Sequence, residues 1–190
     1  MDLATHALAG MAVGAAAARK APLAAALATG VIASVLPDLD AWLYFINLQL
    51  YYEWHRLFTH TLLAAPVIAA AAAAAGLAIG VSGGPPIRPR MGGFTGFPIS
   101  RHRCRKWVGH ATLLATALFA VILHLSLDLL CDWPLRLLWP ISNRDFALAI
   151  INYSHPAFTL GFALLALALL YPLGRRPLNG DSHLFWGQNR

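Results

Sequence analysis

The chain has 190 residues, of which 58% are hydrophobic and 12% are charged. A soluble domain carries about 25% charged residues, so this deficit argues against a soluble protein and predicts one domain in lipid. The net charge of +6 comes from basic clusters beside apolar runs, which favours membrane topology over nucleic-acid binding.

Five apolar stretches predict an all-α fold, a polytopic bundle of about five transmembrane helices. They are Leu3–Ala18, Ala21–Leu36, Thr61–Val81, Trp107–Leu130 and Ala157–Leu173. A transmembrane helix takes about 20 residues, so the third and fourth stretches are long enough to cross a bilayer. The first two are short for full spans and are expected to form a tight helical hairpin, and the fifth is marginal at its length.

The segments between these stretches have distinct compositions. Residues 41–52 are aromatic and apolar, which is typical of the membrane interface. Residues 82–106 are rich in Gly, Pro and Arg and predict a basic loop, while residues 174–190 predict a polar tail. We therefore expect a membrane-embedded domain over residues 1–173 with the basic loop inserted, followed by the tail.

The basic clusters agree on one topology, because Lys and Arg stay on the cytoplasmic side of short loops. Placing the Arg19-Lys20 turn, the loop at residues 82–106 and the Arg175-Arg176 pair in the cytoplasm gives five passes. The first helix then starts outside and the chain ends inside. We expect a bacterial or archaeal inner membrane.

Acidic residues and histidines gather at the non-cytoplasmic end of this bundle. A charged side chain inside a membrane costs about 2.5–3.5 kcal/mol on insertion scales, so it needs a partner or a metal. The residues at this end are His6, Asp38, Asp40, His55, Arg56, His60, His124 and Asp128. Their convergence predicts a polar metal site at one end of the bundle.

His124 and Asp128 form the clearest local pattern, since residues at i and i+4 lie on one helix face. Imidazole nitrogen and carboxylate oxygen are good ligands for Zn²⁺, with Mn²⁺ as the alternative. A hydrogen-bonded pair that bridges helices explains the same pattern equally well, so this pattern alone does not favour either interpretation.

Asp38 and Asp40 follow Pro37, which ends or kinks the preceding helix. Two carboxylates spaced by one residue can face the same side of an extended turn and bridge two metals. The alternative is helix termination with an Asp as N-cap of the next helix, which explains one of the two more easily than both.

His55, Arg56 and His60 form the third pattern. On a continuous helix residues i and i+5 lie about 140° apart, so both histidines reach one site only if the helix begins between them, near Phe58 or Thr59. Arg56 can then pair with a carboxylate or bind a phosphate. The alternative is an interfacial aromatic and basic cluster.

His6 alone is more typical of a packing residue, but the topology places it beside the others. The sequence has no nucleophile motif, Gly-rich phosphate loop or Cys-based zinc motif. Hydrolysis would therefore rest on metal-activated water, with Asp40 or His55 as general base.

These residues resemble a known family, the inner-membrane-associated metal-dependent hydrolases, also described as LexA-regulated hydrolases. The resemblance covers residues 1–142 and rests on Thr5-His6, Pro37-Asp38-Leu39-Asp40, His55-Arg56, Thr59-His60, His124 with Asp128, and Trp139-Pro140. The chain departs from the family at Leu57, where Gly is common, and at Cys131-Asp132-Trp133, where a Thr/Ser-Gly turn is common.

The resemblance supports a membrane-bound metal-dependent hydrolase. The predicted metal ligands are His6, Asp38, Asp40, His60, His124 and Asp128, and the predicted catalytic residues are Asp40, His55 and Arg56. The family is similar to zinc-dependent phospholipase C and related nucleases, which implies a small-molecule or lipid phosphoester as substrate and membrane lipid as partner. No nucleic-acid partner is expected.

The alternative is a non-enzymatic membrane protein that uses the His/Asp cluster for ion binding, transport or structural stabilisation. A transport path needs ionisable groups at both ends and at the midplane, whereas here they gather at one end. That distribution favours a site.

Overall fold

The structure is a computed structural model that describes residues 1–82, 99–152 and 155–174. Its helices are α1 (Leu3–Ala17), α2 (Leu23–Val35), the 3₁₀ helix η1 (Leu36–Trp42), α3 (Leu43–Ile46), α4 (Leu48–Trp54), α5 (Ala65–Ser82), α6 (Ile99–Leu129) and α7 (Pro156–Gly174). Within these residues, strand-like pairing is limited to two isolated bridges. The predicted all-α class is confirmed.

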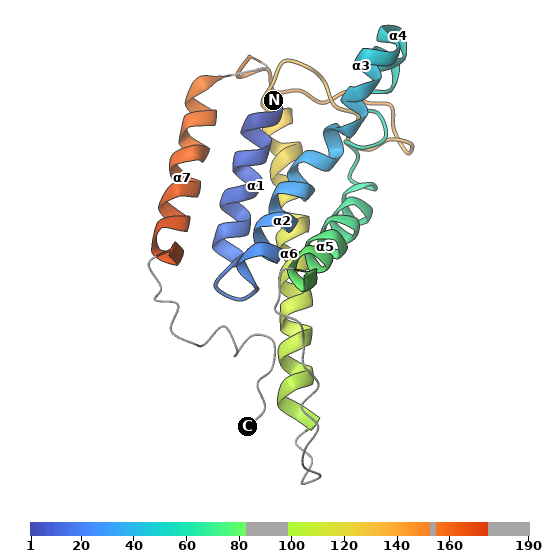
Figure 1. Cartoon of the computed structure of the whole chain (residues 1–190). Helices are drawn as coiled ribbons and strands as arrows, with labels where there is room; N and C mark the ends of the chain where they lie inside the picture. The colour runs from blue at the N-terminus through green and yellow to red at the C-terminus, as the bar shows by residue number, and fades with distance from the viewer. Residues whose placement is uncertain (83–98, 153–154, 175–190) are drawn as a thin grey trace.

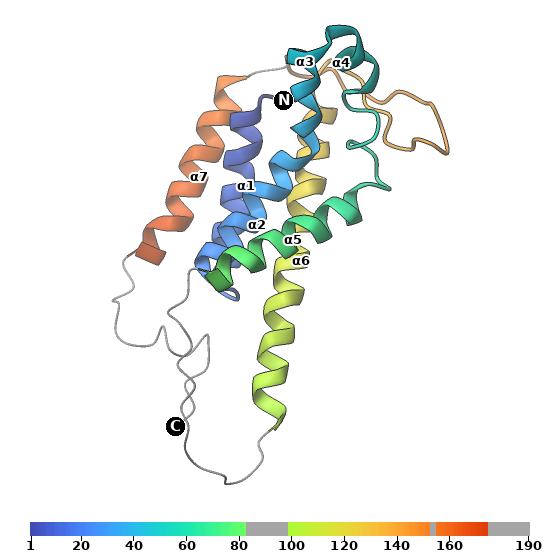
Figure 2. The ribbon, with the colours of Figure 1, turned by 45° about the vertical axis from the view of Figure 1, so that its right-hand side comes forward.

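Helix α2 is the central helix of the bundle. It packs against α1, α5 and α6, while α7 packs on the far side of α1. Figures 1 and 2 show α5 and α7 on opposite flanks, and α6 extending past the other helices at one end. Short helices α3 and α4 lie at the other end, where η1 continues α2 out of the bundle.

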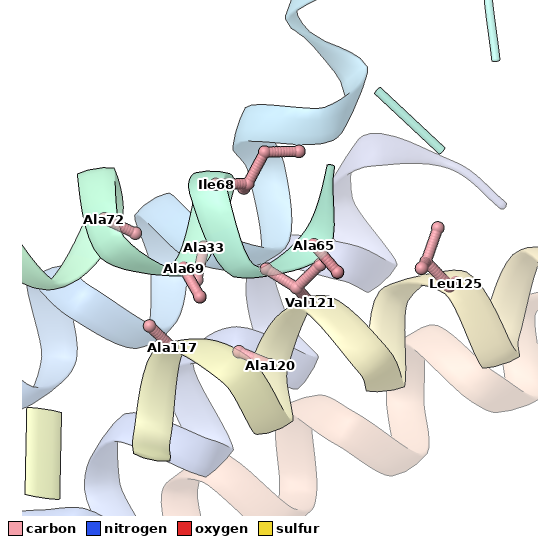
Figure 3. Close-up of a cluster of buried hydrophobic side chains, with 9 residues drawn as sticks. All are labelled: Ala33, Ala65, Ile68, Ala69, Ala72, Ala117, Ala120, Val121 and Leu125. Atoms are coloured by element: carbon pink, nitrogen blue, oxygen red, sulfur yellow. The ribbon is translucent and has the colours of Figure 1, made fainter. Parts of the chain in front are cut away.

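The core between α2, α5 and α6 consists mostly of alanine. Its buried members are Ala33, Ala65, Ile68, Ala69, Ala72, Ala117, Ala120, Val121 and Leu125. Figure 3 shows α5 lying across α6 with these small side chains at the crossing. Small residues let helix backbones approach closely, which is how helices associate in lipid, where apolar burial gives little preference for helix over acyl chain.

Glycines allow close contact between the backbones of α1 and α2. A Cβ at Gly10 would lie 2.3 Å from the carbonyl oxygen of Gly30, and a Cβ at Gly30 would lie 2.2 Å from that of Gly10. Both neighbours are backbone atoms, so neither can turn aside. A side chain at either position would push the two helices apart.

We therefore expect Gly30→Ala to lower the free energy of unfolding by about 1–3 kcal/mol, the range typical of overpacked cores. Gly161→Ala in α7 is the matched control, because a Cβ there meets nothing within 4 Å. Thermal unfolding of the detergent-purified variants, followed by circular dichroism, measures the difference. Equal stability of the two variants would contradict the close packing of α1 on α2.

Three helical segments are long and apolar enough to cross a membrane by length and composition: Leu23–Ile46, Gly109–Leu129 and Pro156–Gly174. The second and fifth stretches of the sequence therefore reach spanning length. The second does so because η1 and α3 extend α2 to 24 residues. Leu3–Ala17 and Ala65–Gly80 are shorter apolar helices. A helical membrane protein is the class this fold defines.

Two predicted boundaries are wrong. Helix α5 begins at Ala65 rather than near Phe58 or Thr59, because Pro66 suits the first turn of a helix and the Thr61 hydroxyl accepts from the backbone N–H of Ala64 just before it. Helix α6 begins at Ile99, inside the predicted basic loop, because residues 99–106 contain no Gly or Pro to break it. The remainder of that loop, residues 83–98, and the tail from residue 175 lie outside the described residues.

Candidate metal centre

The residues predicted to form a site come together from four parts of the chain. His6 lies on α1, Asp38 and Asp40 on η1, His124 and Asp128 on the last turns of α6, and His55, Arg56 and His60 on the segment between α4 and α5. All of these lie at the end of the bundle where α1 starts (Figure 1). The Arg19-Lys20 turn lies at the opposite end, whereas Arg56 and Arg136 lie at the end that carries the His and Asp residues.

Four of these side chains form one compact group: Asp38, His60, His124 and Asp128. Each offers a nitrogen or oxygen atom, and the four atoms lie within 4.8 Å of one another. Three of the four residues are fully buried, and Asp38 is nearly so. This cluster can hold a metal ion. We call it the four-residue cluster.

The spacing of the four atoms is that of ligands around one ion. Nε2 of His60 lies 3.1 Å from Nε2 of His124, 3.2 Å from Oδ1 of Asp38 and 3.2 Å from Oδ2 of Asp128. Nε2 of His124 lies 3.4 Å from the same oxygen of Asp128 and 3.8 Å from that of Asp38. Ligands about 2.0–2.2 Å from a tetrahedral zinc ion are separated by about 3.3–3.6 Å.

Hydrogen bonds outside the cluster turn both histidine lone pairs inward. Nδ1 of His124 donates to the carbonyl oxygen of Ser34 at 2.7 Å, because a carbonyl can only accept. Nδ1 of His60 lies 2.9 Å from the Thr59 hydroxyl, which donates its own proton to Asp40. A proton on Nδ1 of either ring leaves Nε2 as the atom that can direct a lone pair into the cluster. Such outer partners are typical of metal-bound histidines.

Several buried polar atoms of the site lack a hydrogen bond, which also fits an ion. Among the described residues, Oδ2 of Asp128 and Nδ1 of His6 are buried and have no hydrogen bond, although Oδ2 lies near Nε2 of His60 and of His124. His6 lies against the cluster, with Nε2 3.2 Å from Oδ1 of Asp128 and its ring stacked 3.8 Å from that of His124. The amino nitrogen of Met1 also contacts Asp128. The donor set of imidazole and carboxylate suits Zn²⁺ or Mn²⁺.

The protonation of His60 is coupled to metal binding at the cluster. Burial disfavours its charged form, but the carboxylates of Asp128 and Asp38 beside Nε2 outweigh burial and raise the pKa of His60. A proton on Nε2 and a metal ion compete for the same lone pair. Metal binding at this cluster therefore releases a proton when it displaces one.

Asp40 and His55 form a separate pair outside the four-residue cluster. Nδ1 of His55 lies 2.8 Å from Oδ1 of Asp40. The other oxygen of Asp40 accepts from the Thr59 hydroxyl at 3.0 Å and from the backbone N–H of Arg56 at 3.2 Å. Both carboxylate oxygens of Asp40 thus have protein partners, and its prediction as a metal ligand stays a prediction.

Arg56 connects this pair to the cluster. Its Nη2 lies 3.2 Å from Oδ1 of Asp128, its Nη1 donates to the carbonyl oxygen of Trp133 at 3.4 Å, and its guanidinium lies over the Trp133 ring. Its backbone has φ 67°, a left-handed conformation that costs a non-glycine residue about 1–3 kcal/mol. The hydrogen bonds at both ends of the residue hold it there.

The sequence patterns did not identify every residue of the site. Ser34 contributes a backbone carbonyl, which leaves no side-chain signal. Thr59 and Trp133 were noted for the family resemblance alone, and no local pattern marks either as a partner of His60 or Arg56. Both histidines lie in the turn between α4 and α5, before the helix starts, and this turn separates their roles.

The architecture and the site together define a polytopic helical membrane protein with a buried His/Asp cluster that can bind a metal. The chain belongs to the YdjM inner membrane protein family, whose model matches residues 1–185. This membership supports the inner membrane as the location. The family description includes neither a hydrolase activity nor a link to LexA.

Comparisons with curated proteins and with solved structures returned no match.

Proposed function

We propose that this protein is an integral-membrane, metal-dependent hydrolase of phosphoesters, with zinc, or alternatively manganese, as its metal. The observation that carries the proposal is the four-residue cluster, in which two inward-facing histidine lone pairs and two carboxylates have the spacing of ligands around an ion. Asp38, His60, His124 and Asp128 would hold the ion, which would supply Lewis-acid polarisation of a phosphoryl oxygen and activation of water.

His55 serves as the general base in this proposal and Asp40 as its orienting partner. Asp40 accepts from Nδ1 of His55, which leaves Nε2 with the lone pair that takes a proton from water. The water oxygen bonds to phosphorus, the P–O bond to the alcohol breaks, and the departing oxygen takes up a proton. Arg56, one residue further on, offers its guanidinium to the phosphoryl oxygens.

Hydrolysis of p-nitrophenyl phosphate and bis(p-nitrophenyl) phosphate by the reconstituted, zinc-loaded protein tests the proposal. We expect a rate that disappears with a chelator and that falls by about 10²–10⁴-fold in His55→Gln, the usual contribution of a general base. His110→Gln is the control, because His110 is exposed and lies far along α6 from the cluster. A metal-loaded protein that cleaves neither ester would contradict the enzymatic role and favour the alternative, a metal that stabilises the bundle.

The cluster is proposed to face the non-cytoplasmic side. The support is the Arg19-Lys20 turn at the opposite end of the bundle, because basic residues stay in the cytoplasm. We expect Ile141→Cys, at an 81% exposed position of the cluster end, to react with an impermeant maleimide in intact spheroplasts. Lys20→Cys should react only after lysis, with Cys104 and Cys131 replaced by serine in both. The reverse pattern would place the site in the cytoplasm.

A further inference from the structure

A hollow of about 120 Å³ opens beside His55 and Arg56. Its wall includes His55 and Arg56, together with Tyr52, Trp133 and Arg136. Arg56 reaches Asp128 from this wall, so its guanidinium separates the hollow from the cluster. A molecule in the hollow would thus lie beside the proposed base, with the Arg56 guanidinium between it and the candidate metal centre.

The lining of the hollow includes two acidic residues, Glu53 and Asp145, and two arginines, and its inner wall at Arg56 is the part that suits an anion. Nε of Arg56 is buried and has no hydrogen-bond partner among the described residues. An ion held by Asp38 and Asp128 would engage both carboxylates and leave Arg56 as the uncompensated charge. Arg136, at the outer wall, pairs with Asp145 at 3.1 Å, but both are about half exposed, and such surface pairs are weak. A guanidinium fork matches the oxygens of a phosphate.

The size of the hollow limits what it can hold. A water needs only about 10–15 Å³ of such accessible volume, so about 120 Å³ has room for several waters or for one phosphate group. A phosphate at the end of a molecule enters such a space by itself, whereas a diester must bring both of its alcohol groups with it. The hollow therefore suits a terminal phosphate, a phosphomonoester, better than a bulky diester.

The position of the hollow indicates where such a phosphate comes from. Tyr52 in its wall belongs to α4, which follows the candidate span Leu23–Ile46 along the chain. Large apolar side chains on η1, α3 and α4 are exposed, including Trp42 at 67% and Phe45 at 78%. Exposed aromatic rings at the end of a span settle among lipid headgroups. The hollow then lies at headgroup depth.

We infer that the hollow binds the terminal phosphate of a membrane lipid phosphomonoester, with Arg56 as its ligand. Trp133 and Tyr52, whose rings stack 6.1 Å apart, are positioning residues at the side of the hollow. Trp133 acts partly through Arg56, since its carbonyl and its ring both hold that guanidinium. The cleavage of this lipid rests on the function proposed above; its binding does not.

Binding is tested with decylphosphonate, whose C–P bond resists hydrolysis, and with inorganic phosphate. Calorimetric titration of the detergent-purified full chain is carried out in zinc-loaded and chelator-treated forms, so that loss of the metal does not hide binding. We expect decylphosphonate to bind more tightly than phosphate and Trp133→Ala to weaken it about tenfold, as truncation of an aromatic anchor does. Trp42→Ala, exposed and outside the hollow, is the control.

Equal affinity for the two probes would make free phosphate the ligand and overturn the lipid assignment. Absence of binding, or equal weakening in Trp133→Ala and Trp42→Ala, would overturn the hollow as the binding site.

Kinetics separate this inference from the proposed function. Phosphatidic acid in phosphatidylcholine proteoliposomes is compared with glycerol 3-phosphate in solution, which carries the same monoester without acyl chains. We expect faster release of phosphate from the lipid, and a rise in KM with little change in kcat in Trp133→Ala. Equal cleavage of both esters would contradict the lipid assignment and leave the function intact. Binding of decylphosphonate without cleavage of any ester would support the hollow as a lipid-phosphate site and contradict the proposed hydrolase function.

Discussion

The His124→Ala variant is expected to purify without stoichiometric divalent metal, whereas the parent protein retains it. His124 supplies one of two inward-facing Nε2 atoms, and its ring is held from behind by the carbonyl of Ser34. Loss of a residue that hydrogen-bonds to a metal ligand lowers metal affinity about 10–100-fold. Loss of the ligand itself should lower the affinity by more than that. Elemental analysis of the detergent-purified protein after loading with zinc or manganese measures the effect.

His110→Ala is the matched control, because it removes an imidazole from the same helix at an exposed position away from the cluster. It should keep the metal. Retention of metal by both variants would contradict the assignment of His124, and a parent protein that takes up no metal under any loading condition would remove the basis for a metal centre. Circular dichroism of each variant distinguishes loss of a ligand from loss of the fold.

The second large effect is expected from Asp128→Asn. This carboxylate is fully buried and lies against Arg56, His6, His60 and His124. Asparagine keeps the shape but removes the charge, which leaves the Arg56 guanidinium buried beside a neutral amide. Removing one partner of a buried ion pair costs about 3–5 kcal/mol, and we expect a loss of that order in the free energy of unfolding.

Unfolding is followed in the presence of a chelator, so that the lost metal does not add to the difference. Asp132→Asn makes the same chemical change four residues further along, at an exposed position, and should leave stability almost unchanged. If Asp128→Asn unfolds no earlier than Asp132→Asn, the charge of Asp128 does not hold the site together. Recovery of stability in the double variant Asp128→Asn with Arg56→Met would show that the stranded guanidinium is the cause.

The positions of the helices were largely predictable from the sequence, because each helix is determined by the residues of its own segment. Runs of apolar residues must satisfy their backbone within the segment, and a helix does this from its own residues. The observed α1, α2 and α7 therefore lie within one or two residues of the predicted stretches. The errors fall at helix starts, where Pro66 and the continuous run after Pro98 decided the boundary. Local apolarity does not report those features.

The sequence predicted which residues belong to the site better than it predicted how they are arranged. Asp38, His60, His124 and Asp128 carry the residue types a metal needs, and topology alone placed them at one end. Their mutual spacing depends on how α2, α5 and α6 pack, since they are far apart along the chain. Nothing in the pattern of residues 55–60 indicated that His60 would face His124 while His55 turned to Asp40.

By itself the sequence determined that this is a helical membrane protein with histidines and carboxylates at the end opposite its basic turn. Composition and the position of charge carry that information, because the cost of charge in lipid acts on each residue separately. Only the tertiary structure decided which of those residues form the cluster and which hydrogen-bond to it from outside. It also decided that a hollow lies next to Arg56. These depend on close approach of helix backbones at Gly10, Gly30 and the alanine core, and on hydrogen bonds between residues distant in the chain.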